Sequence, residues 1–269
     1  MVEGKPGRGA SDKLLDLAVV MPAYNECDCI VRVVRSWLSM LSAEGIDFRL
    51  IVINDGSTDD TASELEAFNN EPRVDVIDKP NSGHGPTILV GYSEAVDLAE
   101  WVFQCDSDDE IRPDHFPILW RSREQFDALF GIRSGRSQAP SRKLVSYVSN
   151  VTVRVFFGQG VVDANTPYRL IRSPILREII GQIPSNTFAP NVIISGALAR
   201  SGALILNHAV FWEHRKTGKV SIVKWKLVKS VIRAFWQTLR CRPQVPGLGG
   251  LPGGAGSTET REMTRARSG

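Results

Sequence analysis

Short apolar runs alternate with helical patterns along the first half of the chain. Leu17 to Met21 is an apolar run closed by Pro22, which is typical of a buried parallel strand. The apolar positions that follow recur at helical spacing as far as Gly45, and they are Ile30, Val33, Val34, Trp37, Leu38 and Leu41. Further strands are predicted at 49–54, 74–78 and 101–104, with helices at about 60–68 and 86–98. This order predicts an α/β fold with a mostly parallel sheet and helices on both faces.

Four loops follow the predicted strands, and ligands of such sheets gather at the carboxyl ends of the strands. The loops are 22–26, 55–60, 81–85 and 106–109. Beyond residue 130 we expect a helix at about 141–157, a strand and a helix around 168–183, and an apolar segment at 192–212. Polar and charged residues interrupt that last segment, so no bilayer crossing is expected.

Composition places the chain among ordinary globular proteins. Its 269 residues are 42% hydrophobic, enough for one large core. The formal charge of +2 gives no support for a nucleic-acid partner, and none is expected. The four cysteines lack the spacing of a zinc site or a disulfide framework, and residues 1–11 lack the apolar core of a secretion signal. We therefore expect a cytoplasmic protein with reduced thiols.

The densest acidic cluster runs from Asp106 to Glu110, directly after a predicted buried strand. Carboxylates so close together repel one another unless a cation compensates their charge. Oxygen ligands without His or Cys favour Mg²⁺ or Mn²⁺, which commonly also take substrate phosphates as ligands. The alternative is a solvated acidic turn before the helix that follows Pro113.

The other three loops carry groups suited to a nucleotide. The stretch from Pro22 to Glu26 has an aromatic ring that can stack on a base, or it is a turn that begins a helix. Asp55 can accept from a base or ribose, whereas residues 57–59 can cap a helix. His84 and the backbone of 81–85 can approach phosphate, or His84 lies on a surface loop. Walker and dinucleotide-binding motifs are absent from the sequence, which disfavours kinase, NTPase and oxidoreductase functions.

Four motifs taken in order resemble glycosyltransferase family 2, which has the GT-A fold. They are residues 20–26, residues 54–59, Asn81-x-Gly83-x-Gly85 and Asp106-x-Asp108. The similarity extends over about 17–221 and is greatest to the dolichyl-phosphate mannose synthase-like group, the polyprenyl-phosphate glycosyltransferases. The resemblance implies that the donor nucleotide is bound by Pro22, Tyr24, Glu26, Asp55, His84 and Asp106. It also implies that the metal is held by Asp106, Asp108 and Glu110.

The second half of the chain matches the family less closely. Arg133 corresponds to the arginine of a Gly-Ser-Arg motif whose serine is absent here, and Arg142 with Ser146 resembles the family's acceptor-phosphate element. The resemblance thus implies acceptor binding by Arg133, Arg142 and Ser146. Pro167 replaces a usual glycine after Asp163, so we do not infer which sugar is transferred. Arg215 lies in a segment that closes over the phosphates in the family.

These residues imply an inverting transfer of a sugar from a UDP- or GDP-linked donor to a polyprenyl phosphate of the dolichyl or undecaprenyl type. The implied catalytic residues are Asp106, Asp108, Arg133, Asp163 and Arg215. A phosphate acceptor is already ionised, whereas a saccharide hydroxyl acceptor would need a general base, for which Asp163 is suited. One alternative is therefore transfer to a saccharide in surface polysaccharide assembly. Another is a catalytically silent scaffold that binds nucleotide sugars.

We expect four regions along the chain. Residues 1–14 form a flexible start, 15–220 the GT-A domain, 221–242 an amphipathic helix and 243–269 a disordered tail rich in Gly, Pro and Ser. Apolar and aromatic residues oppose basic ones in 221–242. This pattern indicates a helix that lies on an anionic membrane surface, which we expect to be the inner face of the membrane. The alternative is an amphipathic helix that packs on the domain.

Overall fold

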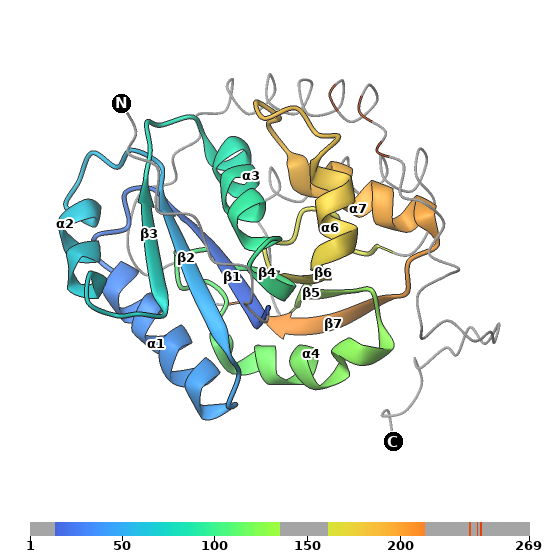
Figure 1. Cartoon of the computed structure of the whole chain (residues 1–269), viewed down its shortest axis with the longest axis horizontal. Coiled ribbons are helices and arrows are strands. Elements are labelled where there is room, and N and C mark those ends of the chain that lie inside the picture. The colour runs from blue at the N-terminus through green and yellow to red at the C-terminus, as the bar shows by residue number, and fades with distance from the viewer. Residues whose placement is uncertain (1–13, 135–160, 213–236, 238–240, 242, 244–269) are drawn as a thin grey trace.

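The computed structural model describes residues 14–134, 161–212, 237, 241 and 243. Within these residues, seven strands form one sheet in the order β3-β2-β1-β4-β6-β5-β7 (Figure 1). The strands are β1 (Leu15–Ala23), β2 (Phe48–Asn54), β3 (Val74–Asp78), β4 (Ala99–Gln104), β5 (Ala128–Ser134), β6 (Arg169–Arg172) and β7 (Ile205–Phe211). The α-helices are α1 (Ile30–Ala43), α2 (Thr61–Leu65), α3 (His84–Ala95), α4 (Phe116–Ser122), α6 (Ser173–Ile180) and α7 (Pro190–Ser201).

Strand direction brings most of the connecting loops to one edge of the sheet. β1 pairs in parallel with β2 and β4, and β2 in parallel with β3. β6 is antiparallel to both β4 and β5, and β7 is parallel to β5. The carboxyl ends of six strands therefore share an edge, and β6 begins at that same edge. The prediction of a mostly parallel sheet is confirmed, with β6 as the exception.

Helices cover both faces of the sheet, as predicted (Figure 1). Leu17, Val19 and Met21 of β1 belong to the core that includes residues of α1 and α4. Ala18 and Val20, between them, belong to the core that includes residues of α3, α6 and α7. All five side chains are fully buried, because a central strand covered on both sides has no solvent face. This burial explains why β1 reads as a continuous apolar run.

Several predicted boundaries shift by a few residues. The helix predicted at 86–98 is α3, which begins two residues earlier, at His84, and ends at Ala95. The helix predicted at 60–68 is α2 followed by a 3₁₀ turn at 66–68. The apolar segment 192–212 contains most of α7 and all of β7. In the described part of the chain, every helix is too short or too polar to cross a membrane.

The helix predicted at 141–157 lies outside the described residues, as does most of the amphipathic segment 221–242. Two residues near the end of that segment contact the domain. The Gln237 side-chain oxygen accepts from the Phe188 N–H over 2.9 Å, and the Cys241 thiol lies 3.4 Å from the Gln182 carbonyl oxygen. Gln237 and Cys241 therefore contact the loop between α6 and α7.

Candidate active site

The acidic cluster lies at the carboxyl edge of the sheet, directly after β4. Asp106, Asp108 and Glu110 line one small pocket. Ser107, between the first two, donates its hydroxyl to the Pro22 carbonyl oxygen over 2.9 Å. This bond ties the cluster to the end of β1. The other residues that line the pocket are Ile111, Pro167, Tyr168 and Trp212.

Protein groups already hold two members of the cluster. The indole N–H of Trp212, which follows β7, donates to Glu110 Oε2 over 2.7 Å. Asp109 has a left-handed backbone, φ 58°, and its carboxylate forms an ion pair with Arg32. The Glu110 N–H also donates to Asp108 Oδ1 over 3.1 Å, and Asp106, Asp108 and Glu110 all line the pocket.

The carboxylates that line the pocket suit a metal ion that also takes substrate phosphates as ligands. Among the described residues, no group of three or more His, Cys, Asp or Glu side chains is arranged to hold a metal ion. Mg²⁺ is commonly held by only one or two carboxylates together with substrate phosphates. Asp106, Asp108 and Glu110 line the same pocket, and metal binding by these three residues stays a prediction.

The loops after β1 and β2 are fastened to each other. Asn25 adopts a left-handed conformation with φ 56°, and its N–H donates to the Ser57 hydroxyl over 3.0 Å. The Thr58 N–H donates back to the Asn25 side-chain oxygen over 2.8 Å. The neighbouring Tyr24 is 38% exposed, so this aromatic residue is accessible to a ligand.

Glu26 is held inside the protein, in contrast to Tyr24. It is only 8% exposed, and its carbonyl oxygen accepts from the Ile30 N–H over 2.9 Å at the start of α1. Its N–H donates to the Thr61 hydroxyl over 2.8 Å. The helix-start interpretation of Glu26 therefore has direct structural support, and nucleoside binding by this residue stays a prediction.

Asp59 stabilises the start of the next helix. Its carboxylate accepts from the Thr61 N–H over 3.0 Å and from the Cys27 N–H over 3.3 Å. Burial alone raises the pKa of Asp59, but hydrogen bonds from Thr61 and Cys27 outweigh it and lower the pKa. The N-cap of α2 is Asp60, without a side-chain cap hydrogen bond, so the predicted capping by one of residues 57–59 is wrong, and Asp59 instead links the start of α2 to the loop after β1.

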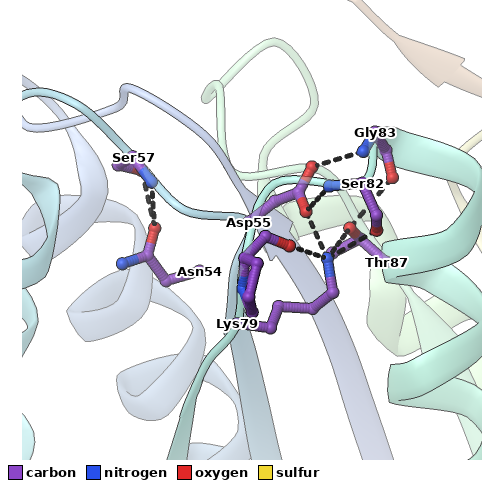
Figure 2. Close-up of polar contacts among 8 residues, drawn as sticks. Asn54, Asp55, Ser57, Lys79, Ser82, Gly83 and Thr87 are labelled. Carbon is purple, nitrogen blue, oxygen red and sulfur yellow. Dashed lines mark hydrogen bonds and ion pairs between the residues drawn. The ribbon is translucent and has the colours of Figure 1, made fainter.

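Asp55, which directly follows β2, forms several polar contacts with the loop before α3 (Figure 2). It is 4% exposed, forms an ion pair with Lys79, and accepts from the N–H groups of Ser82 and Gly83, both over 2.9 Å. Burial raises its pKa, but hydrogen bonds from Lys79, Ser82 and Thr87 outweigh this and hold the pKa below its ordinary value. The carboxylate is therefore ionised and fixes the loop before α3.

His84 and Gly85 place the start of α3 close to the acidic cluster. The His84 side chain is 59% exposed, and its Nε2 lies 3.9 Å from Asp106 Oδ1. A Cβ atom on Gly85 would lie 2.3 Å from the carbonyl oxygens of Thr187 and Phe188. Only glycine permits this close approach, which packs α3 against the loop before α7.

The loop that carries Asp163 reaches the same edge because it leads into β6. The Asp163 carboxylate accepts from the Asn165 N–H over 3.3 Å. The Thr166 hydroxyl donates to the Gly131 carbonyl oxygen over 2.6 Å, and the Ser195 hydroxyl donates to the Ala164 carbonyl oxygen over 2.9 Å. Strand β5 and helix α7 thus both anchor the loop.

Arg169 is a buried cation for which the sequence suggested no role. It is fully buried, and its guanidinium donates to the carbonyl oxygens of Thr166 over 2.6 Å, Ala164 over 3.2 Å and Asn191 over 3.2 Å. An arginine that begins a strand and is followed by two apolar residues, Leu170 and Ile171, is the signal that could have identified it. Through these bonds it fixes the loop after Asp163.

A buried polar network lies beneath the end of β4. The Tyr92 hydroxyl and the Asn191 amide both donate to Gln104 Oε1, over 2.7 Å and 3.0 Å. Burial raises the pKa of Tyr92, so its phenol stays protonated and acts as the donor. Since Gln104 is two residues before Asp106, the network fixes the strand from which the acidic cluster projects.

The basic residues expected at the acceptor side are only partly described. Arg133 lies near the carboxyl end of β5, at the edge shared with Asp106. Arg142, Ser146 and Arg215 lie outside the described residues, so their roles stay predictions.

Comparison with known proteins decides the family. The sequence profile described as "Glycosyl transferase family 2" matches residues 18–180, more than half of the chain and all of the loops above. The chain belongs to glycosyl transferase family 2. The resemblance noted in the sequence is therefore confirmed.

Curated members of family 2 match at modest identity. An undecaprenyl-phosphate 4-deoxy-4-formamido-L-arabinose transferase from Pectobacterium carotovorum subsp. carotovorum is 26% identical over 193 residues, which are 70% of this chain and 58% of that protein. The transferase of the same description from Yersinia enterocolitica is 23% identical over 240 residues, 88% of this chain and 70% of that protein. The first alignment thus spans little more than half of its relative's length.

A solved structure confirms the fold. Glucosyl-3-phosphoglycerate synthase from Mycobacterium tuberculosis, in complex with Mn²⁺, uridine diphosphate and phosphoglyceric acid, superposes with a TM-score of 0.62 at 17% identity. The superposition covers 83% of this chain and 78% of that one. At this identity the similarity establishes the GT-A-like fold alone.

Proposed function

We propose that this family 2 protein transfers a sugar, with inversion, from a nucleotide-diphosphate sugar to a polyprenyl phosphate. The observation that carries the proposal is the position of Asp106 and Asp108 in one pocket at the carboxyl edge of the sheet. His84 lies 3.9 Å from Asp106, and Ser107 binds the carbonyl oxygen of Pro22 at the end of β1. The names of the curated relatives, which are undecaprenyl-phosphate transferases, support a lipid phosphate as acceptor.

Different residues of the site bind the base and the diphosphate of the donor. Tyr24, which is partly exposed, stacks on the base, and His84 lies beside Asp106, near the diphosphate. Asp106 and Asp108, with Glu110 at the pocket wall, would hold Mg²⁺ or Mn²⁺. Such an ion offsets the negative charge that develops on the departing diphosphate. The acceptor oxygen attacks the anomeric carbon from the opposite side.

A phosphate acceptor fits the charges at this edge. It is ionised at neutral pH and needs no proton removed, so Asp163 serves to shape the pocket rather than as a base. Arg133 at the end of β5, with Arg142, Ser146 and Arg215, supplies the cationic and hydroxyl groups for the acceptor phosphate. A lipid acceptor lies in a membrane, and we propose that the protein binds the cytoplasmic face of that membrane through segment 221–242.

Transfer to a lipid can be measured directly. The full chain is incubated with radiolabelled UDP- and GDP-sugars, Mn²⁺ or Mg²⁺, and undecaprenyl phosphate in detergent micelles. The proposal predicts label in the butanol phase from one donor class, and none without metal or with Asp106→Asn. Label on an added oligosaccharide instead would favour the saccharide acceptor. Nucleotide binding without any transfer or donor hydrolysis would favour a silent scaffold.

A further inference from the structure

The end of β7 is held by a side chain from another part of the fold. β7 is the last strand in the sheet order, and within the described residues it has a partner strand, β5, on one side only. A backbone N–H on the outer side of such a strand needs another acceptor. His115, which directly precedes α4, supplies it: its Nε2 accepts from the Phe211 N–H over 2.9 Å, and the two rings stack at an interplanar angle of 13°.

Trp212, the residue after this N–H donor, belongs to the pocket of the acidic cluster. Its indole N–H donates to Glu110 Oε2 over 2.7 Å, and its side chain is one of those that line the pocket. Only 7% of Trp212 is exposed, against 71% of Phe211. Successive side chains of an extended chain point to opposite sides, so Phe211 faces solvent where Trp212 faces the pocket. The bond at the Phe211 N–H therefore fixes the backbone from which the indole projects.

Two hydrogen bonds thus fasten the segment 110–115 to residues 211–212 at both of its ends. Glu110 at one end accepts from Trp212, and His115 at the other end accepts from Phe211. His115 itself is not among the residues that line the pocket. Its effect on the pocket therefore passes through the strand end.

We propose that His115 is a positioning residue for the donor site. Through the Phe211 N–H it holds Trp212 against Glu110, at the wall of the pocket in which the diphosphate and its metal ion would bind. The inference rests on the proposed function and adds to it a residue outside the pocket. Without the acceptor on His115, the strand end is free to move, and Glu110 loses its indole donor for part of the time.

Calorimetry on the full chain with Mn²⁺ tests the proposal. UDP and GDP are compared on wild type, and the variants are tested with the nucleotide that it binds. His115→Phe keeps a ring beside Phe211 but has no acceptor, so the Kd should rise roughly five- to tenfold, the usual worth of one hydrogen bond. Trp212→Phe, which lacks the indole N–H, should weaken binding similarly. The double variant should bind no more weakly than Trp212→Phe alone, because both changes act through one contact.

Two amide substitutions form a matched pair. His115→Gln places an amide oxygen near the position of Nε2, so its Kd should lie within about twofold of wild type. His115→Asn carries the same amide one methylene shorter and should bind as weakly as His115→Phe, which preserves the test if His115→Phe fails to fold. His208→Phe is a further control, because it removes the neighbouring imidazole, 6.5 Å away in β7, and should keep the wild-type Kd.

Three results would overturn the role of His115. They are wild-type binding by both His115→Phe and His115→Asn, equal binding by His115→Gln and His115→Asn, and losses that add in the double variant. Each of these leaves nucleotide-sugar transfer intact, since wild type still binds the nucleotide. Binding of neither UDP nor GDP by wild type would instead overturn the proposed function together with this inference.

Discussion

The guanidinium of Arg169 donates to the carbonyl oxygen of Thr166, three residues earlier, over 2.6 Å. The whole arginine side chain is buried, and it also binds the carbonyl oxygens of Ala164 and Asn191. The loop before β6 and the start of α7, which are distant in sequence, therefore meet on one cation. Because Asp163 directly precedes Ala164, the position of this carboxylate depends on the arginine.

Arg169→Met should destabilise the protein strongly. Each buried carbonyl oxygen left without a donor costs roughly 1–3 kcal/mol, so we expect a loss of about 3 kcal/mol or more in the free energy of unfolding. Urea denaturation measures it. Arg172→Met, in the same strand with a side chain 31% exposed, is the control and should cost much less. Similar losses in the two variants would show that Arg169 does not anchor the loop.

Gly85→Ala should disrupt the contact between α3 and the loop before α7. Its Cβ would lie 2.3 Å from two backbone carbonyl oxygens, which cannot move aside as a flexible side chain can. We expect a loss of more than roughly 2 kcal/mol. Gly181→Ala, whose nearest contact would be 3.4 Å and whose φ is negative, should change the melting temperature little. A melting temperature for Gly85→Ala equal to that of Gly181→Ala would contradict the close packing.

The first half of the sheet could be predicted from sequence because its strands are buried on both faces. Continuous apolar runs such as Leu17 to Met21 have few other uses in a globular protein. The loops that follow parallel strands meet at one edge, so the meeting of His84 with Asp106 also followed from the order of elements.

Other features depend on tertiary contacts that leave no periodic signal. β6 has only four residues, and its antiparallel direction is set by β4 and β5. The burial of Arg169 depends on Asn191, 22 residues away. Glu26 resembles a ligand-binding carboxylate in sequence, but its 8% exposure follows from the packing around α1.

Asp163→Asn tests whether the site needs a general base. With a polyprenyl phosphate acceptor, turnover should fall far less than the roughly 100-fold or greater loss typical when a base is removed. Steady-state kinetics on undecaprenyl phosphate measures this, with the KM of the donor as a control for binding. Near-complete loss of turnover with an unchanged donor KM would count against a phosphate acceptor.

The lowered pKa of Asp55 predicts how its contribution to stability depends on pH. A carboxylate whose pKa is lower in the folded state stabilises the fold above its unfolded pKa, here about 3.8, and loses that effect as pH falls through the folded value. The stability difference between wild type and Asp55→Asn should thus be constant from pH 7 to pH 5 and shrink below about pH 4. Urea denaturation at each pH measures it. A difference that already declines between pH 7 and pH 5 would contradict the assignment.

Metal-dependent binding of a nucleoside diphosphate, UDP or GDP, is the most direct test of a nucleotide-sugar site built on Asp106 and Asp108. Calorimetry compares wild type with Asp108→Ala, with and without Mn²⁺, and Asp97→Ala is the control because its exposed carboxylate lies outside the pocket. We predict binding by wild type and Asp97→Ala that requires Mn²⁺ and is lost in Asp108→Ala. Equal binding by Asp108→Ala and wild type, or wild-type binding that is indifferent to the metal, would contradict the proposed site.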